Sequence, residues 1–215
     1  MPKKIKRQLS EGPMTRLEQH VAKRIVPFIP SDISANNITA VTAFAGVLTG
    51  VSNAFTSWSR EMFLVACIFM LLHWLGDALD GALARYRKTS SKNGFYMDHM
   101  LDAVTVSSIF IGLYLSTFTN TAWPLVFALL YLIMEINVMV QAILLGSFKI
   151  SVFILGPAEA QFLFIAGNIA AYFLAPKGIL FWDMGSIVGV IILSLAFTYS
   201  FIQTVAKTMR LDRNN

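Results

Sequence analysis

The sequence between Gly76 and Val104, GDALDGALARYRKTSSKNGFYMDHMLDAV, decides the fold. It holds four of the twelve acidic residues of the chain: Asp77, Asp80, Asp98 and Asp102. The first two are spaced i, i+3 and the last two i, i+4, so each pair occupies one face of a helix. Apolar segments flank the stretch on both sides, and the residues between the two pairs are polar and basic. We therefore predict an antiparallel helical hairpin that gathers four carboxylates at one end.

The composition of the chain is too apolar for a soluble globule. Hydrophobic residues make up 56% of the 215 positions and charged residues 13%, against about 45–50% and about 25% in soluble domains. Six segments have the length, about 17–25 mostly apolar residues, that crosses a bilayer as a helix. These segments are 38–57, 62–83, 98–119, 122–145, 159–175 and 183–206. We predict an all-α integral membrane protein, built as a six-transmembrane-helix bundle.

The basic residues predict the orientation of this bundle. With six spans starting inside, the inside segments hold 15 of the 17 Lys and Arg residues; these segments are 1–37, 84–97, 146–158 and 207–215. The outside loops hold only Arg60 and Lys177. Cytoplasmic loops of membrane proteins carry such an excess of positive charge. We expect both termini and the aspartate cluster on the cytoplasmic side.

The N-terminal segment predicts contact with the membrane surface. Residues 14–28 place apolar side chains at helical spacing and basic side chains on other faces, which is typical of an amphipathic interfacial helix. Pro27 and Pro30 should end this helix. We divide the chain into a cytoplasmic basic segment with this helix (1–37), a six-span domain (38–206) and a cytoplasmic basic tail (207–215). The basic residues flank spans and accompany no nucleic-acid motif, so membrane lipids are the expected partners and nucleic acid is not.

Four carboxylates in one place indicate bound cations. Their mutual repulsion favours protonation unless positive charge compensates them, and hard oxygen ligands suit Mg²⁺ or Mn²⁺. Two such ions would form an electropositive floor for a diphosphate. The plainer interpretation treats the four as surface aspartates on solvated helix ends, paired with Arg87, Lys88 and Lys92.

The spacing of the motif resembles the signature of a known family. The pattern D-x2-D-G-x2-A-R-x8-G-x3-D-x3-D is similar to that of the CDP-alcohol phosphotransferases (CDP-alcohol phosphatidyltransferases). Its fixed positions are all present here: Asp77, Asp80, Gly81, Ala84, Arg85, Gly94, Asp98 and Asp102. The stretch from Ala35 to Thr39 is similar to a P-N-x-I-T segment entering the first span, with Ala35 where proline is usual.

The resemblance implies a displacement at the diphosphate of a CDP-activated alcohol. An acceptor hydroxyl attacks the β-phosphorus, CMP leaves and a phosphodiester forms. Two metal ions are implied, with ligands among Asp77, Asp80, Asp98 and Asp102, and Asp102 is implied as the general base. The implied CDP site consists of Asn36, Thr39, Asp80, Gly81, Ala84 and Arg85.

Five further residues are weaker candidates for acceptor binding or for support of the metal ligands: His73, His99, Glu135, Lys149 and Glu159. His73 can also be an ordinary interhelical histidine, and Lys149 can meet a phosphate or extend to the membrane surface. Glu135 is an acid within a predicted span, where acids are rare; it can line an acceptor cavity or pair across helices. Residues 156–159 resemble the G-P-T-E segment of the choline/ethanolamine phosphotransferase branch, although an acid at a helix N-terminus is favoured by the helix dipole alone.

Two other classes of protein remain as alternatives. A UbiA-type prenyltransferase also arranges aspartates around Mg²⁺ and a diphosphate, but typically has more spans and two well-separated acidic motifs. A cation transporter would place its acids nearer the membrane midplane. The motif does not say whether the lipid or the polar alcohol carries CDP. The small-x3-small spacing of Gly46 and Gly50 leaves close packing inside the bundle or in a homodimer open.

Overall fold

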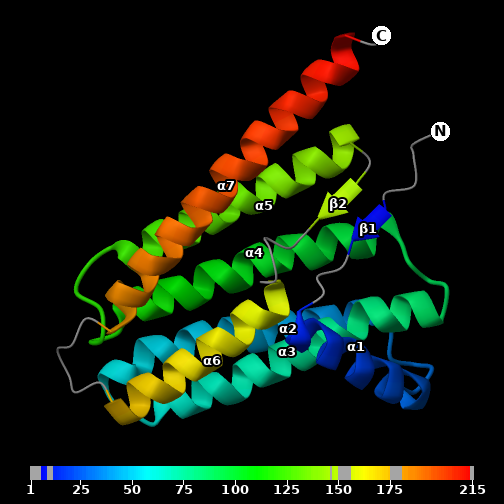
Figure 1. Cartoon of the computed structure of the whole chain (residues 1–215). Helices are drawn as coiled ribbons and strands as arrows, with labels where there is room; N and C mark the ends of the chain where they lie inside the picture. Colours follow the sequence, from blue (N-terminus) through cyan, green and yellow to red (C-terminus); the bar gives the residue numbers. More distant parts are fainter. Residues whose placement is uncertain (1–5, 9–11, 146, 150–155, 175–180, 214–215) are drawn as a thin grey trace.

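The computed structural model describes residues 6–8, 12–145, 147–149, 156–174 and 181–213. Its elements in chain order are β1 (Lys6–Gln8), α1 (Pro13–Ile25), the 3₁₀ turn η1 (Val26–Phe28), α2 (Ala35–Ala54), the 3₁₀ turn η2 (Phe55–Ser57), α3 (Met62–Tyr86), α4 (Lys92–Leu115), α5 (Trp123–Leu145), β2 (Ser147–Lys149), α6 (Pro157–Leu174) and α7 (Phe181–Arg213). Figure 1 shows the helices as an elongated bundle in which α5 and α7 form a separate pair along α4.

A helix lies in each of the six predicted spans. Within the described residues, four of them are long and apolar enough to cross a membrane: α2 with its η2 extension, α3, α5 and α7. The other two, α4 and α6, do not reach that apolar content because α4 carries the paired aspartates and α6 carries Glu159, Gln161 and Asn168. The chain is thus a helical integral membrane protein, with α4 and α6 as its polar members.

The ends of several elements differ from those predicted. Helix α7 continues to Arg213, so most of the predicted tail at 207–215 is helical. The prediction also missed β1 and β2, which pair in parallel with Arg7 opposite Phe148. Each strand has three residues, which is too short for the alternating pattern that identifies a strand in a sequence.

Glycines allow α2 to pack closely against α3 and α4. A Cβ on Gly50 or Gly112 would overlap the backbone of the opposing helix, and one on Gly46 would overlap the side chain of Thr105. A Cβ on Gly76 would likewise overlap Thr42. The small-x3-small spacing of Gly46 and Gly50 therefore serves contacts inside the bundle.

A buried glutamate attaches α1 to α6. Oε1 of Glu159 accepts hydrogen bonds from the backbone N–H groups of Met14 and Thr15, both at 3.0 Å. Oε2 accepts from Oγ1 of Thr15 at 3.1 Å and from the backbone N–H of Gly156 at 3.0 Å. The carboxylate thus satisfies N–H groups that a helix start leaves without partners. Helix α1 ends at Ile25, just before the predicted break at Pro27.

Two sets of hydrogen bonds stabilise the turn of the α3–α4 hairpin. The guanidinium of Arg87 donates to the backbone carbonyls of Ile29 and Pro30, both at 2.8 Å, and holds the α3 end against the segment before α2. Ser91 caps α4: its Oγ accepts from the backbone N–H of Gly94 at 3.0 Å. These contacts fix where α4 begins, and hence where its two aspartates lie.

Candidate active site

Three of the four motif aspartates converge in space. Asp77 from α3 and Asp98 and Asp102 from α4 each place a carboxylate oxygen within 4.8 Å of the others. All three are partly buried. In the part of the chain that the structure describes, this is the group of acids able to hold a metal ion. Its donors are hard oxygens, the kind that Mg²⁺ and Mn²⁺ prefer, so the residues present fit the implied ions.

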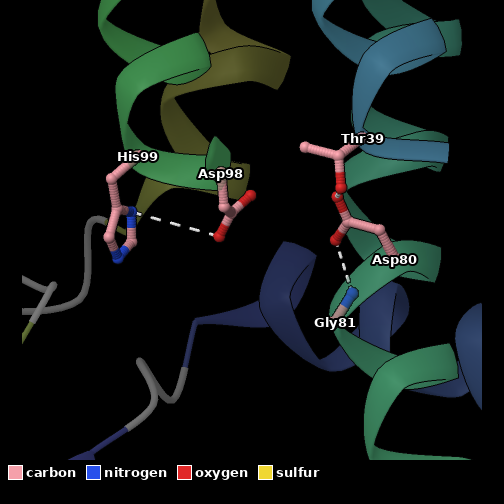
Figure 2. A network of polar contacts seen from close by, with 5 residues as sticks. All are labelled: Thr39, Asp80, Gly81, Asp98 and His99. Carbon is pink, nitrogen blue, oxygen red and sulfur yellow. Dashed lines mark hydrogen bonds and ion pairs between the residues drawn. The ribbon is translucent and has the colours of Figure 1, made fainter. Parts of the chain in front are cut away.

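The fourth aspartate lies to one side of this group. Asp80 is 6% exposed, and its Oδ2 accepts a hydrogen bond from Oγ1 of Thr39 at 2.7 Å. Its Oδ1 accepts from the backbone N–H of Gly81. Figure 2 shows Thr39 and Asp80 on one side of the site and Asp98 on the other. The four carboxylates therefore share one neighbourhood but divide into a group of three and a separately held Asp80.

A pocket opens between α2, α3 and α4 beside the aspartates. All six residues of the implied CDP site line it: Asn36, Thr39, Asp80, Gly81, Ala84 and Arg85. Gly94 and Asp98 contribute from α4. Ala35 also lines the pocket, as do Thr89, Ser90, Ser91 and Phe95. Sequence reasoning did not single out these last four, although the polar composition of the α3–α4 connection was a signal for the three hydroxyls.

The small residues of the motif make room in this pocket. A Cβ on Gly81 would lie 3.2 Å from Nη1 of Arg85, and one on Gly94 would lie 3.4 Å from Oδ1 of Asn36. The glycines thus let a guanidinium and an amide lie close to the backbone of the pocket. A planar guanidinium suits phosphate oxygens.

The two histidines near the motif occupy different surroundings. Nδ1 of His99 lies 4.0 Å from Oδ2 of Asp98, and its ring meets Phe95 edge to face with the centroids 4.3 Å apart. His73 is buried between α2 and α3, with Nδ1 3.0 Å from the carbonyl oxygen of Thr42. His99 is therefore next to a metal-ligand candidate. The Nδ1 contact of His73 joins α3 to α2, and neither His73 nor Thr42 lines the pocket.

Helix α5 brings two residues into the neighbourhood of the aspartates. Glu135 lies within electrostatic range of Asp98 and Asp102. Tyr131, one turn earlier, lies within electrostatic range of Asp102 and Glu135. Sequence reasoning noticed Glu135 but missed Tyr131, because a tyrosine in an apolar span carries no signal by itself. The neighbouring amides Asn137 and Gln141 instead donate to Oγ of Ser200 in α7, at 3.0 and 2.7 Å.

The remaining candidates lie elsewhere. Glu159 accepts the hydrogen bonds that hold α1, and it is not among the pocket residues. The side chain of Lys149 is outside the described part of the chain. The interpretation of the aspartates as surface residues paired with basic side chains included Arg87 as one of the partners. In the structure, the Arg87 guanidinium instead donates to backbone carbonyls of the segment between η1 and α2.

This arrangement defines a class of protein: a membrane-embedded helical bundle with a carboxylate group and a polar, arginine-containing pocket at one end. The family model described as CDP-alcohol phosphatidyltransferase matches residues 28–202, so the chain belongs to the CDP-alcohol phosphatidyltransferase family. It is an enzyme of phospholipid biosynthesis that transfers substituted phosphate groups from CDP-alcohols. The family match favours this class over the prenyltransferase and the transporter.

A solved structure shares the fold. The chain is similar to the Mycobacterium tuberculosis phosphatidylinositol phosphate synthase PgsA1, crystallised with CDP-DAG bound, with a TM-score of 0.58 and 16% sequence identity. The match covers 89% of this chain and 92% of that chain. No curated protein matches this sequence.

Proposed function

We propose that this enzyme joins an acceptor hydroxyl to the β-phosphate of a CDP-alcohol at the cytoplasmic face of a membrane. The single observation that carries the proposal is that the implied CDP site and the aspartate group lie side by side. The six residues of the implied CDP site line one pocket, and the group of three aspartates lies directly beside it.

In the proposed reaction the acceptor oxygen forms a bond to the β-phosphorus of the CDP-alcohol. The bond from that phosphorus to the oxygen bridging the two phosphates breaks, and the electron pair leaves with CMP. Asp102 takes the acceptor proton, since an alcohol is a poor nucleophile until a base removes its proton. Arg85 binds phosphate oxygens in the pocket, while Asn36 and Thr39 contact the nucleotide.

The proposed reaction also uses two divalent metal ions, with the motif aspartates as their ligands. Asp77, Asp98 and Asp102 would hold one ion, and Asp80 would contribute to a second from the pocket side. When bound, Mg²⁺ or Mn²⁺ neutralises charge that develops on the phosphate oxygens. The aspartates would hold the ions, and the pocket residues would orient the diphosphate beside the aspartates.

The donor is tested directly by measuring CMP release. The full chain, purified in detergent with Mg²⁺, is incubated with CDP-diacylglycerol and a panel of polar alcohols, and in parallel with CDP-polar alcohols and diacylglycerol. PgsA1 binds CDP-DAG, which makes the first series the natural starting point. CMP release that depends on both substrates supports the proposal. No CMP from any pair, with a correctly folded enzyme, would overturn it.

A further inference from the structure

Arg87 follows the last residue of α3, in the turn of the hairpin that carries the motif aspartates. Its half-buried guanidinium donates to three backbone carbonyls of one short segment. Nη1 donates to Ile33 at 2.5 Å, and Nη2 donates to Ile29 and Pro30, both at 2.8 Å. Hydrogen bonds from a charged donor are roughly twice as strong as neutral ones. One side chain therefore attaches the segment 29–33, which lies outside the motif, to the motif hairpin.

Backbone hydrogen bonds at the end of α3 fix the position of Arg87. The N–H of Thr89 donates to the carbonyl of Ala84 at 2.9 Å. The N–H of Lys88 donates to the carbonyl of Arg85 at 3.2 Å, and Lys88 itself has a φ of 57°. This pair of bonds around one left-handed residue is a common way to close a helix. The chain reverses there, so that Thr89 returns along the pocket while Arg87 bonds to the segment before α2.

The segment 29–33 leads directly into the part of α2 that lines the pocket. Ser34 caps the helix, with its Oγ accepting a hydrogen bond from a backbone N–H of the first turn at 3.2 Å. Ala35, Asn36 and Thr39 follow, and all three line the pocket. Since a single residue separates the segment from α2, a shift of the segment would move this wall of the pocket relative to α3.

We propose that Arg87 is a positioning residue for the CDP-alcohol, because its bonds to the segment 29–33 hold the start of α2 at the pocket. This inference rests on the proposed function and adds a residue outside the fixed positions of the motif. Arg87 is not among the residues that line the pocket, so it acts through Asn36 and Thr39. The backbone bonds that close α3 and the Ser91 cap of α4 do not involve the Arg87 side chain. Loss of that side chain should therefore leave the hairpin folded and weaken the binding of the nucleotide.

Arg87→Lys is the decisive variant because it keeps the positive charge. An ammonium group lacks the planar fork with which two nitrogens of arginine reach several carbonyls. We expect CDP to bind about tenfold more weakly in the presence of Mg²⁺, and Arg87→Gln to lose up to about a hundredfold. Calorimetry on the full chain in detergent measures this affinity. In the substrate pair that releases CMP, the KM for the CDP-alcohol should rise by a similar factor, whereas kcat and the KM for the acceptor should stay close to the wild type.

Lys92→Gln is the matched control for charge. Lys92 is the first residue of α4, in the same hairpin as Arg87; it is exposed and does not line the pocket. If the hairpin attracted the nucleotide only through its positive charge, this variant would also bind CDP more weakly. We expect its affinity for CDP to stay close to that of the wild type.

Hydrogen exchange measured by mass spectrometry reports on the position of the segment itself. In Arg87→Lys the backbone N–H groups of residues 29–39 should exchange faster, while those of α5 and α7 should keep the wild-type rate. Faster exchange throughout the chain would indicate misfolding instead. The wild-type enzyme offers a measurement that needs no variant. Because coupling between two sites is reciprocal, CDP with Mg²⁺ should slow the exchange of residues 29–33, which do not line the pocket.

Three results would overturn the inference. The first is wild-type affinity of Arg87→Lys for CDP. The second is an equal loss of affinity in Lys92→Gln, which would reduce Arg87 to a general charge. The third is exchange of residues 29–33 in the wild-type enzyme that CDP leaves unchanged, a result that does not depend on how a variant folds. Each of these leaves the proposed function intact as long as the wild type releases CMP. A wild-type enzyme that neither binds CDP nor releases CMP would refute the proposed function.

Discussion

Oγ1 of Thr39 in α2 lies 2.7 Å from Oδ2 of Asp80 in α3 and donates a hydrogen bond to it. Both side chains are buried, with 7% of Thr39 and 6% of Asp80 exposed. The hydroxyl therefore fixes an aspartate of the motif from a helix outside the motif. Thr39 belongs to the stretch Ala35–Thr39, which resembles the P-N-x-I-T segment of the family. The contact gives that stretch a role in the site, because it places a hydrogen-bond donor beside the pocket.

Thr39→Val should impair donor binding. Valine has a similar shape but cannot donate, so the Asp80 carboxylate loses its orienting contact at a cost of about 1.5–3 kcal/mol. We expect the KM for the CDP-alcohol to rise about ten- to a hundredfold, measured by CMP release. Thr39→Ser keeps the hydroxyl and should stay close to the wild type. Equal KM values for the valine and serine variants would show that the hydrogen bond does not orient the site.

Asp102 and Asp80 should respond differently to amide substitution. Asn at position 102 keeps the size of the side chain but cannot accept the proton, and loss of a general base typically lowers the rate about 10²–10⁴-fold. Asp102→Asn should therefore lose most turnover while retaining much of its CDP-substrate binding. Asp80→Asn should weaken binding as well. If Asp102→Asn loses nucleotide binding as completely as Asp80→Asn, then Asp102 acts chiefly as a ligand. Near-normal turnover would transfer the role of base to another residue, with His99 and Glu135 the next candidates.

Metal dependence can be measured with and without turnover. Chelation should abolish CMP release, and Mg²⁺ or Mn²⁺ should restore it, because the ions neutralise phosphate charge. Mg²⁺ should also raise the melting temperature of the resting enzyme, since a ligand that binds only the folded state stabilises it. Asp98→Asn should remove this rise, whereas Asp80→Asn should reduce it less because Asp80 lies outside the group of three. Full turnover after thorough chelation would contradict the metal site.

Glu159→Gln should weaken the attachment of α1 to α6 and leave the residues of the pocket unchanged. An amide cannot accept all four hydrogen bonds that the carboxylate accepts, and the loss should be about 1–3 kcal/mol. The melting temperature should fall by about 2–4 °C for each kcal/mol. Trypsin should also cleave faster after Arg16, Lys23 and Arg24. Asp212→Asn, an exposed acid near the end of α7, is the control; equal cleavage of the two variants would show that Glu159 does not hold α1.

The charge distribution predicts that both termini face the cytoplasm. Cys67 is buried and can be replaced by alanine, so that single cysteines report on each side. In intact cells an impermeant maleimide should label Glu61→Cys, in the α2–α3 connection, and should leave Asp212→Cys unlabelled until the cells are opened. The reverse pattern would refute the six-span orientation.

The sequence by itself determined those features that depend on neighbouring positions. Helical spacing placed the aspartates of each pair on one face, and the signature identified the family. Apolar run lengths located the six helices, with ends that differ from the observed ones by up to seven residues. Local rules also predicted the end of α1 before Pro27. Each of these depends on residues within one or two helical turns, or on a fixed pattern along the chain.

The tertiary structure decided what depends on contacts between distant segments. It separated Asp80, held by Thr39 from 41 positions away, from the three converging aspartates. It assigned Glu159 to the start of α1, 144 positions away, and it brought Tyr131 and Glu135 of α5 to the aspartate group. Spacing along one helix fixes which face a side chain occupies, but the partner of that face depends on how the helices pack. The close approach of α2 to α3 and α4, which Gly50, Gly76 and Gly112 permit, therefore set the site geometry that local patterns left open.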